Sequence, residues 1–121
     1  MPRTFVFEDL NFQTGSARLT PESTRTVTDL VAILKAYPTA KAHLDGHTDN
    51  TGDAAANKQL SLDRAKAVRD MMIADGIDAA RLNYAGFGQE HPLAPNDTED
   101  GRARNRRTEL VVLAKQRRAD A

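Results

Sequence analysis

The pattern of apolar and polar positions along the chain predicts strands and helices in turn. An apolar, Phe-rich run over residues 4–12 indicates a first strand, and turn-forming residues around Gly15 close it. Thr20, Pro21 and Glu22 follow as an N-cap, a first-position proline and a first-turn acid, which predicts the start of a helix. The apolar face of this helix consists of Val27, Leu30, Val31 and Leu34.

A second strand and a second helix are predicted after Pro38, which ends the first helix. Apolar residues alternate with polar ones over residues 40–44, and this period of two indicates a strand. Ser61 is a suitable N-cap for the second helix, and Asp63 suits its first turn. Gly76 then provides the C-terminal stop of that helix.

The remaining pattern completes a single small domain. Residues 82–85 indicate a third strand, and residues 86–100 are typical of a loop that leads into a short helix. The apolar run over residues 108–113 indicates a fourth strand that is buried on both faces. The chain therefore predicts one α+β domain of order βαβαβ(α)β, with its core over residues 4–114 and a polar tail. Two main helices should pack on one face of a small, mixed, four-stranded sheet.

Composition narrows the functional class. Lys+Arg and Asp+Glu each number 17, so the net charge is zero and no nucleic acid partner is expected from bulk charge. The absence of cysteine excludes disulfides and thiolate metal sites. No apolar run reaches membrane-spanning length, and no signal peptide is visible. We therefore expect either a cytosolic protein or one domain of a longer exported protein.

The most informative motif is the Gly-flanked turn over residues 46–52 together with the helix expected after Ser61. Asp49 lies in the turn, and Arg64 would lie in the first turn of that helix. A helix N-terminus favours anions, so an arginine there is best explained by a site that holds an anion. Asp49 would bind a cation of the same ligand, and Asn57 would add a neutral hydrogen bond. The alternative is a purely structural salt bridge between Asp49 and Arg64.

Metal binding and catalysis are the alternatives to this ligand site. The metal alternative comes from an alternating run of imidazoles and carboxylates, namely His43, Asp45, His47 and Asp49. Gly46 ends the expected strand too early to align them, so we expect no metal and no cofactor. A nucleophile with an adjacent base is also not evident, since Ser61 is better used as a cap, and we expect no enzyme.

A cluster of arginines over residues 102–107 is the last candidate site. Only 5% of the chain is aromatic, so a base-stacking surface for nucleic acid is not expected. We expect some of these arginines to pair with acids such as Asp45 or Glu109, and the others to be solvated.

Many landmarks occur in an order that identifies a family. They are Gly46-His47-Thr48-Asp49 with Gly52, Asn57, Leu60-Ser61, Arg64-Ala65, Gly86-Phe87-Gly88, Gly101-Arg102, and Asn105-Arg106-Arg107 with Glu109. In these features the chain resembles the OmpA-like C-terminal domain, the peptidoglycan-associating module of the OmpA, Pal and MotB proteins. The resemblance covers nearly everything from Phe5 to Leu113.

The resemblance implies a βαβαβ-type fold that binds the peptide stem of peptidoglycan without covalent or catalytic chemistry. It assigns Asp49 and Arg64 to hold diaminopimelate, with the Asn105-Arg106-Arg107 motif supporting the site through either Arg106 or Arg107. The other expected ligand-binding residues are Asn57, Thr51, Asn50, Asn11, Leu60 and Ser61.

The same resemblance implies a place in the cell. We expect a domain on the periplasmic face of the envelope, whose parent reaches the membrane through segments absent here. The parent is left open among a barrel protein, a lipoprotein, a stator subunit and a secretion-system anchor. A periplasmic protein-interaction module that uses the same surface is the alternative function.

Overall fold

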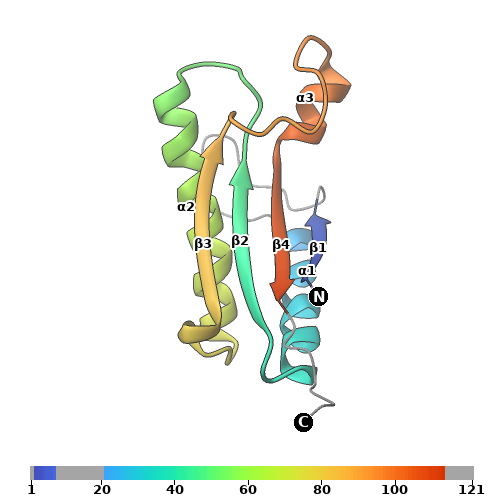
Figure 1. Cartoon of the computed structure of the whole chain (residues 1–121), viewed down its shortest axis with the longest axis vertical. Helices are drawn as coiled ribbons and strands as arrows, with labels where there is room; N and C mark the ends of the chain where they lie inside the picture. The colour runs from blue at the N-terminus through green and yellow to red at the C-terminus, as the bar shows by residue number, and fades with distance from the viewer. Residues whose placement is uncertain (1, 8–20, 114–121) are drawn as a thin grey trace.

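The computed structural model describes residues 2–7 and 21–113 (Figure 1). The elements, in chain order, are β1 (Pro2–Phe7), α1 (Pro21–Ala36), β2 (Lys41–His47), α2 (Ala54–Ala74), the short 3-10 helix η1 (Ala79–Arg81), β3 (Leu82–Gly88), α3 (Glu99–Asn105) and β4 (Arg107–Leu113). Residues 8–12 of the predicted first strand, Gly15 and Thr20 lie outside the described residues.

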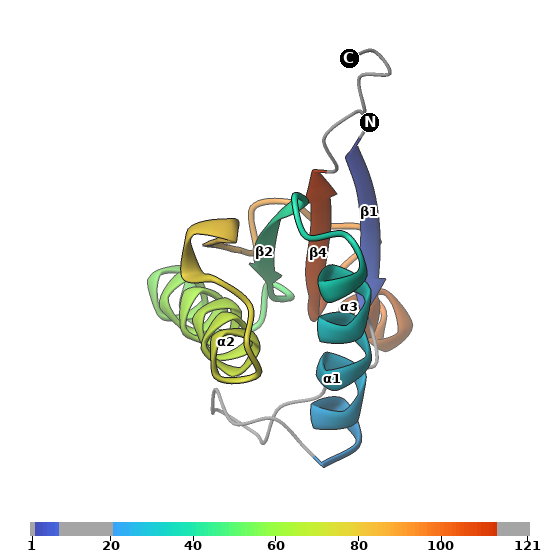
Figure 2. The same cartoon turned by 90° about the horizontal axis from the view of Figure 1, so that it is seen from below.

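The strands form one mixed sheet in the order β1-β4-β2-β3. β2 and β3 are parallel, and β4 runs antiparallel to both β1 and β2. Figure 2 shows α1 and α2 on the same face of this sheet, where α2 packs against β2 and β3. The predicted α+β class with a mixed sheet is therefore confirmed. Within the described part of the chain, no helix has the length and apolar character needed to cross a membrane.

The core lies between the helices and the sheet. The predicted face of α1 is confirmed, because Val27, Leu30, Val31 and Leu34 are all buried. They meet apolar residues of α2 and of the strands, namely Ala42, Leu44, Ala65, Val68, Met72, Leu82 and Leu110. Along β4, buried Leu110 and Val112 alternate with the more exposed Val111 and Leu113. The predicted burial of this strand on both faces is therefore wrong, because α1 and α2, the two main helices of the described residues, both pack on the other face of the sheet.

Most predicted helix boundaries are confirmed, but the start of α2 is not. α1 begins at Pro21 and ends at Ala36, just before Pro38. α2 ends at Ala74, and Gly76 follows with a φ of +107°, the left-handed conformation that stops helices.

The N-cap of α2 is Asp53 rather than Ser61. The Asp53 carboxylate accepts a hydrogen bond from the Ala56 amide at 2.8 Å, and Gly52 turns the chain into the cap with a φ of +86°. α2 therefore begins at Ala54, and its cap lies eight residues earlier than predicted. Arg64 consequently lies in the interior of the helix, and the prediction that it occupies the first turn is wrong.

A pair of glycines lets α2 lie directly on the parallel strands. Gly46 of β2 pairs with Gly86 of β3, so that the two lie side by side in the sheet. A Cβ atom at Gly46 would collide with the Ser61 carbonyl, and one at Gly86 would collide with the backbone of Leu62. This close approach fixes the turn of α2 that precedes Arg64 against the end of the sheet.

Candidate functional site

The candidate site lies at the end of the sheet where β2 and β3 finish and β4 begins (Figure 1). Asp49 follows β2 by two residues, and the Thr48 amide donates to the Gly88 carbonyl at 2.8 Å. Arg106 comes from the other direction, between the end of α3 and the start of β4. Because β4 is antiparallel to β2, its first residues meet the last residues of β2 at this edge.

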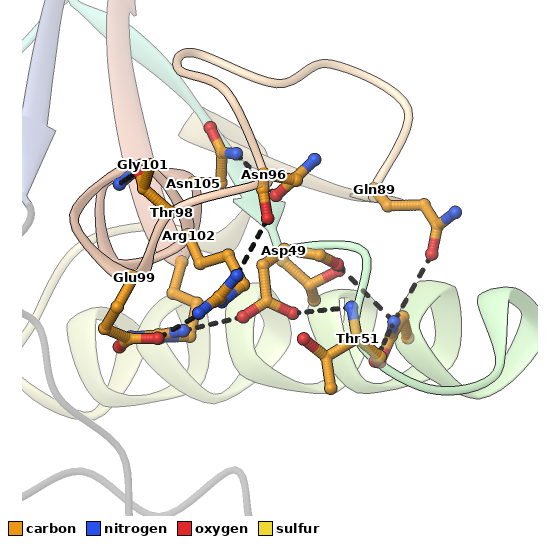
Figure 3. A network of polar contacts seen from close by, with 12 residues as sticks. Asp49, Thr51, Gln89, Asn96, Thr98, Glu99, Gly101, Arg102 and Asn105 are labelled. Atoms are coloured by element: carbon orange, nitrogen blue, oxygen red, sulfur yellow. Dashed lines mark hydrogen bonds and ion pairs between the residues drawn. The ribbon is translucent and has the colours of Figure 1, made fainter.

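Asp49 is a buried carboxylate with both oxygens engaged. Its Oδ1 atom accepts a hydrogen bond from the Thr51 amide at 2.9 Å, and its Oδ2 atom accepts from Arg106 Nη1 at 2.6 Å (Figure 3). Burial acts to raise the pKa of Asp49, but the Thr51 amide and the Arg106 guanidinium outweigh it and hold the pKa below its usual value. Asp49 is therefore an ionised group in a mostly buried position.

The structure shows which of the two adjacent arginines, Arg106 or Arg107, faces Asp49. Arg106 faces Asp49, and its second terminal nitrogen, Nη2, donates to Glu99 Oε2 at 2.7 Å. Arg107 is buried elsewhere, where it donates to Glu109 Oε2 at 2.6 Å and to the His91 carbonyl at 3.0 Å. The predicted pairing of clustered arginines with acids is confirmed for Glu109.

Arg64 contributes a second guanidinium to this region. It is partly buried on α2, and its pKa is lowered by burial and then by the positive charge of Arg106. The guanidinium groups of Arg64 and Arg106 are thus close enough for the charge of one to act on the other, and Arg106 also contacts the buried carboxylate of Asp49. Among the ion pairs of the described residues, Asp49 pairs with Arg106, and the structural salt bridge between Asp49 and Arg64 is not present.

Asn57 holds the turn that presents Asp49. Its Nδ2 atom donates to the Thr51 carbonyl at 2.9 Å and lies 3.5 Å from the Asp49 carbonyl. The same nitrogen lies 3.4 Å from Gln89 Oε1. Sequence reasoning missed Gln89, which follows Gly86-Phe87-Gly88 and carries no local signal of this contact.

The other predicted ligand-binding residues differ in their surroundings. Asn50 is exposed and Leu60 is partly buried, whereas Asn11 lies outside the described residues. Ser61 is fully buried, where its hydroxyl donates to the Lys58 carbonyl at 2.8 Å and accepts from the Gly88 amide at 2.9 Å. Ser61 thus connects α2 to the end of β3.

A polar network that sequence reasoning missed holds α3 beside the site. The Asn105 amide is fully buried, and its Oδ1 atom accepts from the backbone amides of Leu93 and Ala94 at 2.6 and 2.9 Å. Its Nδ2 atom donates to Asn96 Oδ1 at 2.8 Å (Figure 3). The available signal was the Asn105-Arg106-Arg107 motif, whose asparagine fixes the preceding loop while its first arginine reaches Asp49.

The alternating histidines and carboxylates of β2 do not assemble a metal site. Over the described residues, no group of three His, Cys, Asp or Glu side chains is placed to hold a metal ion. His47 instead stacks on Phe87, with ring centroids 5.5 Å apart.

The chain is similar in sequence to known proteins. A sequence profile described as the OmpA family matches residues 11–106. The chain is 38% identical over 104 residues to the Probable lipoprotein YiaD of Escherichia coli (strain K12), covering 86% of this chain and 48% of that protein. It is 40% identical over 101 residues to the Peptidoglycan-binding protein ArfA of Mycobacterium tuberculosis (strain H37Rv), covering 84% of this chain and 31% of that protein.

A solved structure has a similar overall fold. The cell wall anchor of the T6SS from Pseudomonas aeruginosa superposes with a TM-score of 0.81 at 31% identity, covering 94% of this chain and 81% of that one. The chain spans about half or less of the length of the curated relatives described here.

Proposed function

This chain belongs to the OmpA family, and from that premise we propose that it binds peptidoglycan non-covalently through the diaminopimelate of the stem peptide. In this proposal the domain has no catalytic step. It lies on the periplasmic face of the cell envelope and tethers the envelope to the cell wall. The names of two similar proteins support the wall as the partner, since one is a peptidoglycan-binding protein and the other a cell wall anchor.

The observation that carries the proposal is the buried, ionised carboxylate of Asp49 in its ion pair with Arg106, whose positive charge in turn acts on Arg64. The free end of diaminopimelate has one ammonium and one carboxylate. Asp49 would bind the ammonium, and Arg64 would bind the carboxylate. Charge-assisted hydrogen bonds contribute about 1.5–3 kcal/mol each. Desolvation and lost freedom offset part of this, so we expect modest affinity for one domain.

The test is retention of the purified domain on insoluble peptidoglycan. We expect Asp49→Ala and Arg64→Ala to abolish the pull-down and to lower the thermal midpoint only slightly. Asp63→Ala and Lys66→Ala are matched controls, since they remove one charge of each sign from exposed positions of α2. Both controls should bind as the wild type does. Undiminished binding by Asp49→Ala would show that the wall is held elsewhere.

A second experiment tests the identity of the ligand. A diaminopimelate-containing stem tripeptide and its lysine counterpart differ by one carboxylate at the end of the side chain. If Arg64 binds that carboxylate, the lysine peptide should bind roughly tenfold or more weakly. Equal affinities would contradict the assignment of Arg64.

A further inference from the structure

Asp49 is already occupied by a cation from its own chain. Arg106 Nη1 lies 2.6 Å from Asp49 Oδ2, which is a short, charge-assisted hydrogen bond. An external ammonium that approaches Asp49 therefore meets a carboxylate whose charge is already balanced. It also meets the positive charges of Arg106 and Arg64, which act on each other.

Arg106 forms a second ion pair, with Glu99, in addition to its pair with Asp49. Its Nη2 atom donates to Glu99 Oε2 at 2.7 Å, so each terminal nitrogen of the guanidinium donates to a different carboxylate. The side chain of Asp49 is 11% exposed, whereas those of Arg106 and Glu99 are 40% and 66% exposed. The bond to Glu99 thus lies toward solvent, and it can persist when the bond to Asp49 is broken.

Glu99 is itself held in place by groups other than Arg106. Its Oε1 atom accepts from Arg102 Nε at 3.2 Å, and Arg102 also donates to the Asn96 carbonyl at 2.9 Å. Thr98 caps the short helix α3 at the residue before Glu99, where its hydroxyl accepts from the Gly101 amide at 3.0 Å. Figure 3 shows Thr98, Glu99 and Arg102 together on the side of Asp49 away from Thr51.

We propose that Arg106 is an internal stand-in for the ammonium of the ligand at Asp49, and that Glu99 is the positioning residue that retains Arg106 when the ligand displaces it. The inference rests on the proposed function and adds a selection rule to it. A ligand with an ammonium alone breaks the bond between Asp49 and Arg106 and gives Arg106 no new anion in place of Asp49. A ligand that also brings a carboxylate supplies that anion, so the exchange favours zwitterionic ends over simple cations.

The test measures the affinity of the full chain for two probes by calorimetry, the diaminopimelate stem tripeptide and its lysine counterpart. In Arg106→Gln, Asp49 loses its internal partner, so the lysine peptide should bind more tightly than it binds the wild type. The preference for diaminopimelate should then fall by roughly tenfold. An arginine that only supports the fold, or that only contacts the ligand carboxylate, would not raise the affinity for lysine.

The role of Glu99 is tested separately. Glu99→Gln should lower the affinity for the diaminopimelate peptide by roughly threefold, because the displaced Arg106 then has no carboxylate at position 99 to pair with. In the Arg106→Gln background the same change should have no effect, since Glu99 acts through Arg106. Glu90→Gln is the matched control, because Glu90 is an exposed carboxylate paired with Lys58 at 2.8 Å and should leave both affinities unchanged.

The outcomes separate this inference from the function on which it rests. Suppose that the wild type binds the diaminopimelate peptide but Arg106→Gln leaves its preference over the lysine peptide unchanged. The proposed displacement of Arg106 by the ligand is then overturned, and the wall-binding proposal stands. Tighter binding by Glu99→Gln would also overturn it, because Glu99 would then hold Arg106 against the ligand. If the wild type binds neither peptide, both proposals fail.

Discussion

At the scale of single residues, His47 is the titratable group most altered by the fold. Its imidazole is buried between Phe87 of β3 and Arg107 and Glu109 of β4, with His91 of the following loop at its edge. Neither ring nitrogen has a hydrogen-bond partner among the described residues, although Nε2 lies 3.7 Å from a Glu109 oxygen. Burial and then the charge of Arg107 lower the pKa of His47 from 6.5 to about 4.

This shift predicts a loss of stability in mild acid. The unfolded chain takes up a proton on His47 near pH 6.5, whereas the folded domain does so only near pH 4. The contribution of His47 is thus complete above pH 6.5 and is lost as the pH falls toward 4. The difference amounts to about 3 kcal/mol of the free energy of unfolding. Urea unfolding from pH 7 to pH 4 should show this loss in the wild type.

The control for this prediction is His47→Phe, which keeps a ring against Phe87 but cannot be protonated. The loss between pH 7 and pH 4 should be smaller in this variant by about 3 kcal/mol. Parallel curves for the two proteins over this range would contradict the assignment to His47.

At the scale of elements, the start of α2 sets the geometry of the Asp49 turn. Asp53 caps the helix, and Asn57 in its first turns donates back to the Thr51 carbonyl. The first two turns of α2 are mostly exposed and contain no large apolar residue before Leu60. Hydrophobic periodicity therefore gives no signal there, and the cap is the main local reason why the helix starts at Ala54.

Asp53→Ala should accordingly destabilise the domain. Loss of the hydrogen bond to the Ala56 amide is expected to cost about 1 kcal/mol of unfolding free energy. Amide hydrogen exchange should become faster at residues 55–57 in particular. Asp63→Ala, which removes an exposed carboxylate in the middle of the same helix, should change the stability by less than about 0.5 kcal/mol. Equal losses in the two variants would argue against capping by Asp53.

At the scale of the whole molecule, the mixed sheet gathers the candidate site from distant parts of the chain. Asp49 follows β2, Gln89 follows β3, and Arg106 precedes β4, so three connections meet at one end of the sheet. The site lies at the surface of a small domain, which suits binding to a polymer that repeats the same ligand many times. In this setting, many weak contacts act together.

The proposed function therefore predicts strong avidity. Two copies of the domain joined by a flexible linker should be retained on insoluble peptidoglycan roughly 10²-fold or more better than one copy. A tandem in which one copy carries Arg64→Ala should return to the retention of the single domain. Sedimentation assays over a series of wall concentrations measure both. Retention of this mixed tandem at the level of the intact tandem would contradict binding through Arg64.

The sequence by itself determined the α+β class, the buried face of α1, the stop at Gly76 and the residues worth testing. These follow from interactions within a few residues of the chain, such as Pro21 in the first turn of α1 or the left-handed φ at Gly76. The family resemblance rests on the same local motifs, and the profile match over residues 11–106 bears it out.

Only the tertiary structure decided which arginine meets Asp49. Arg106 and Arg107 are adjacent and chemically identical, so no local rule separates them. The register of β4 places Arg107 opposite His47, within the sheet, and leaves Arg106 at the end of α3 facing Asp49. Such long-range pairing depends on how strands align across the sheet, and the sequence around either arginine does not contain that information.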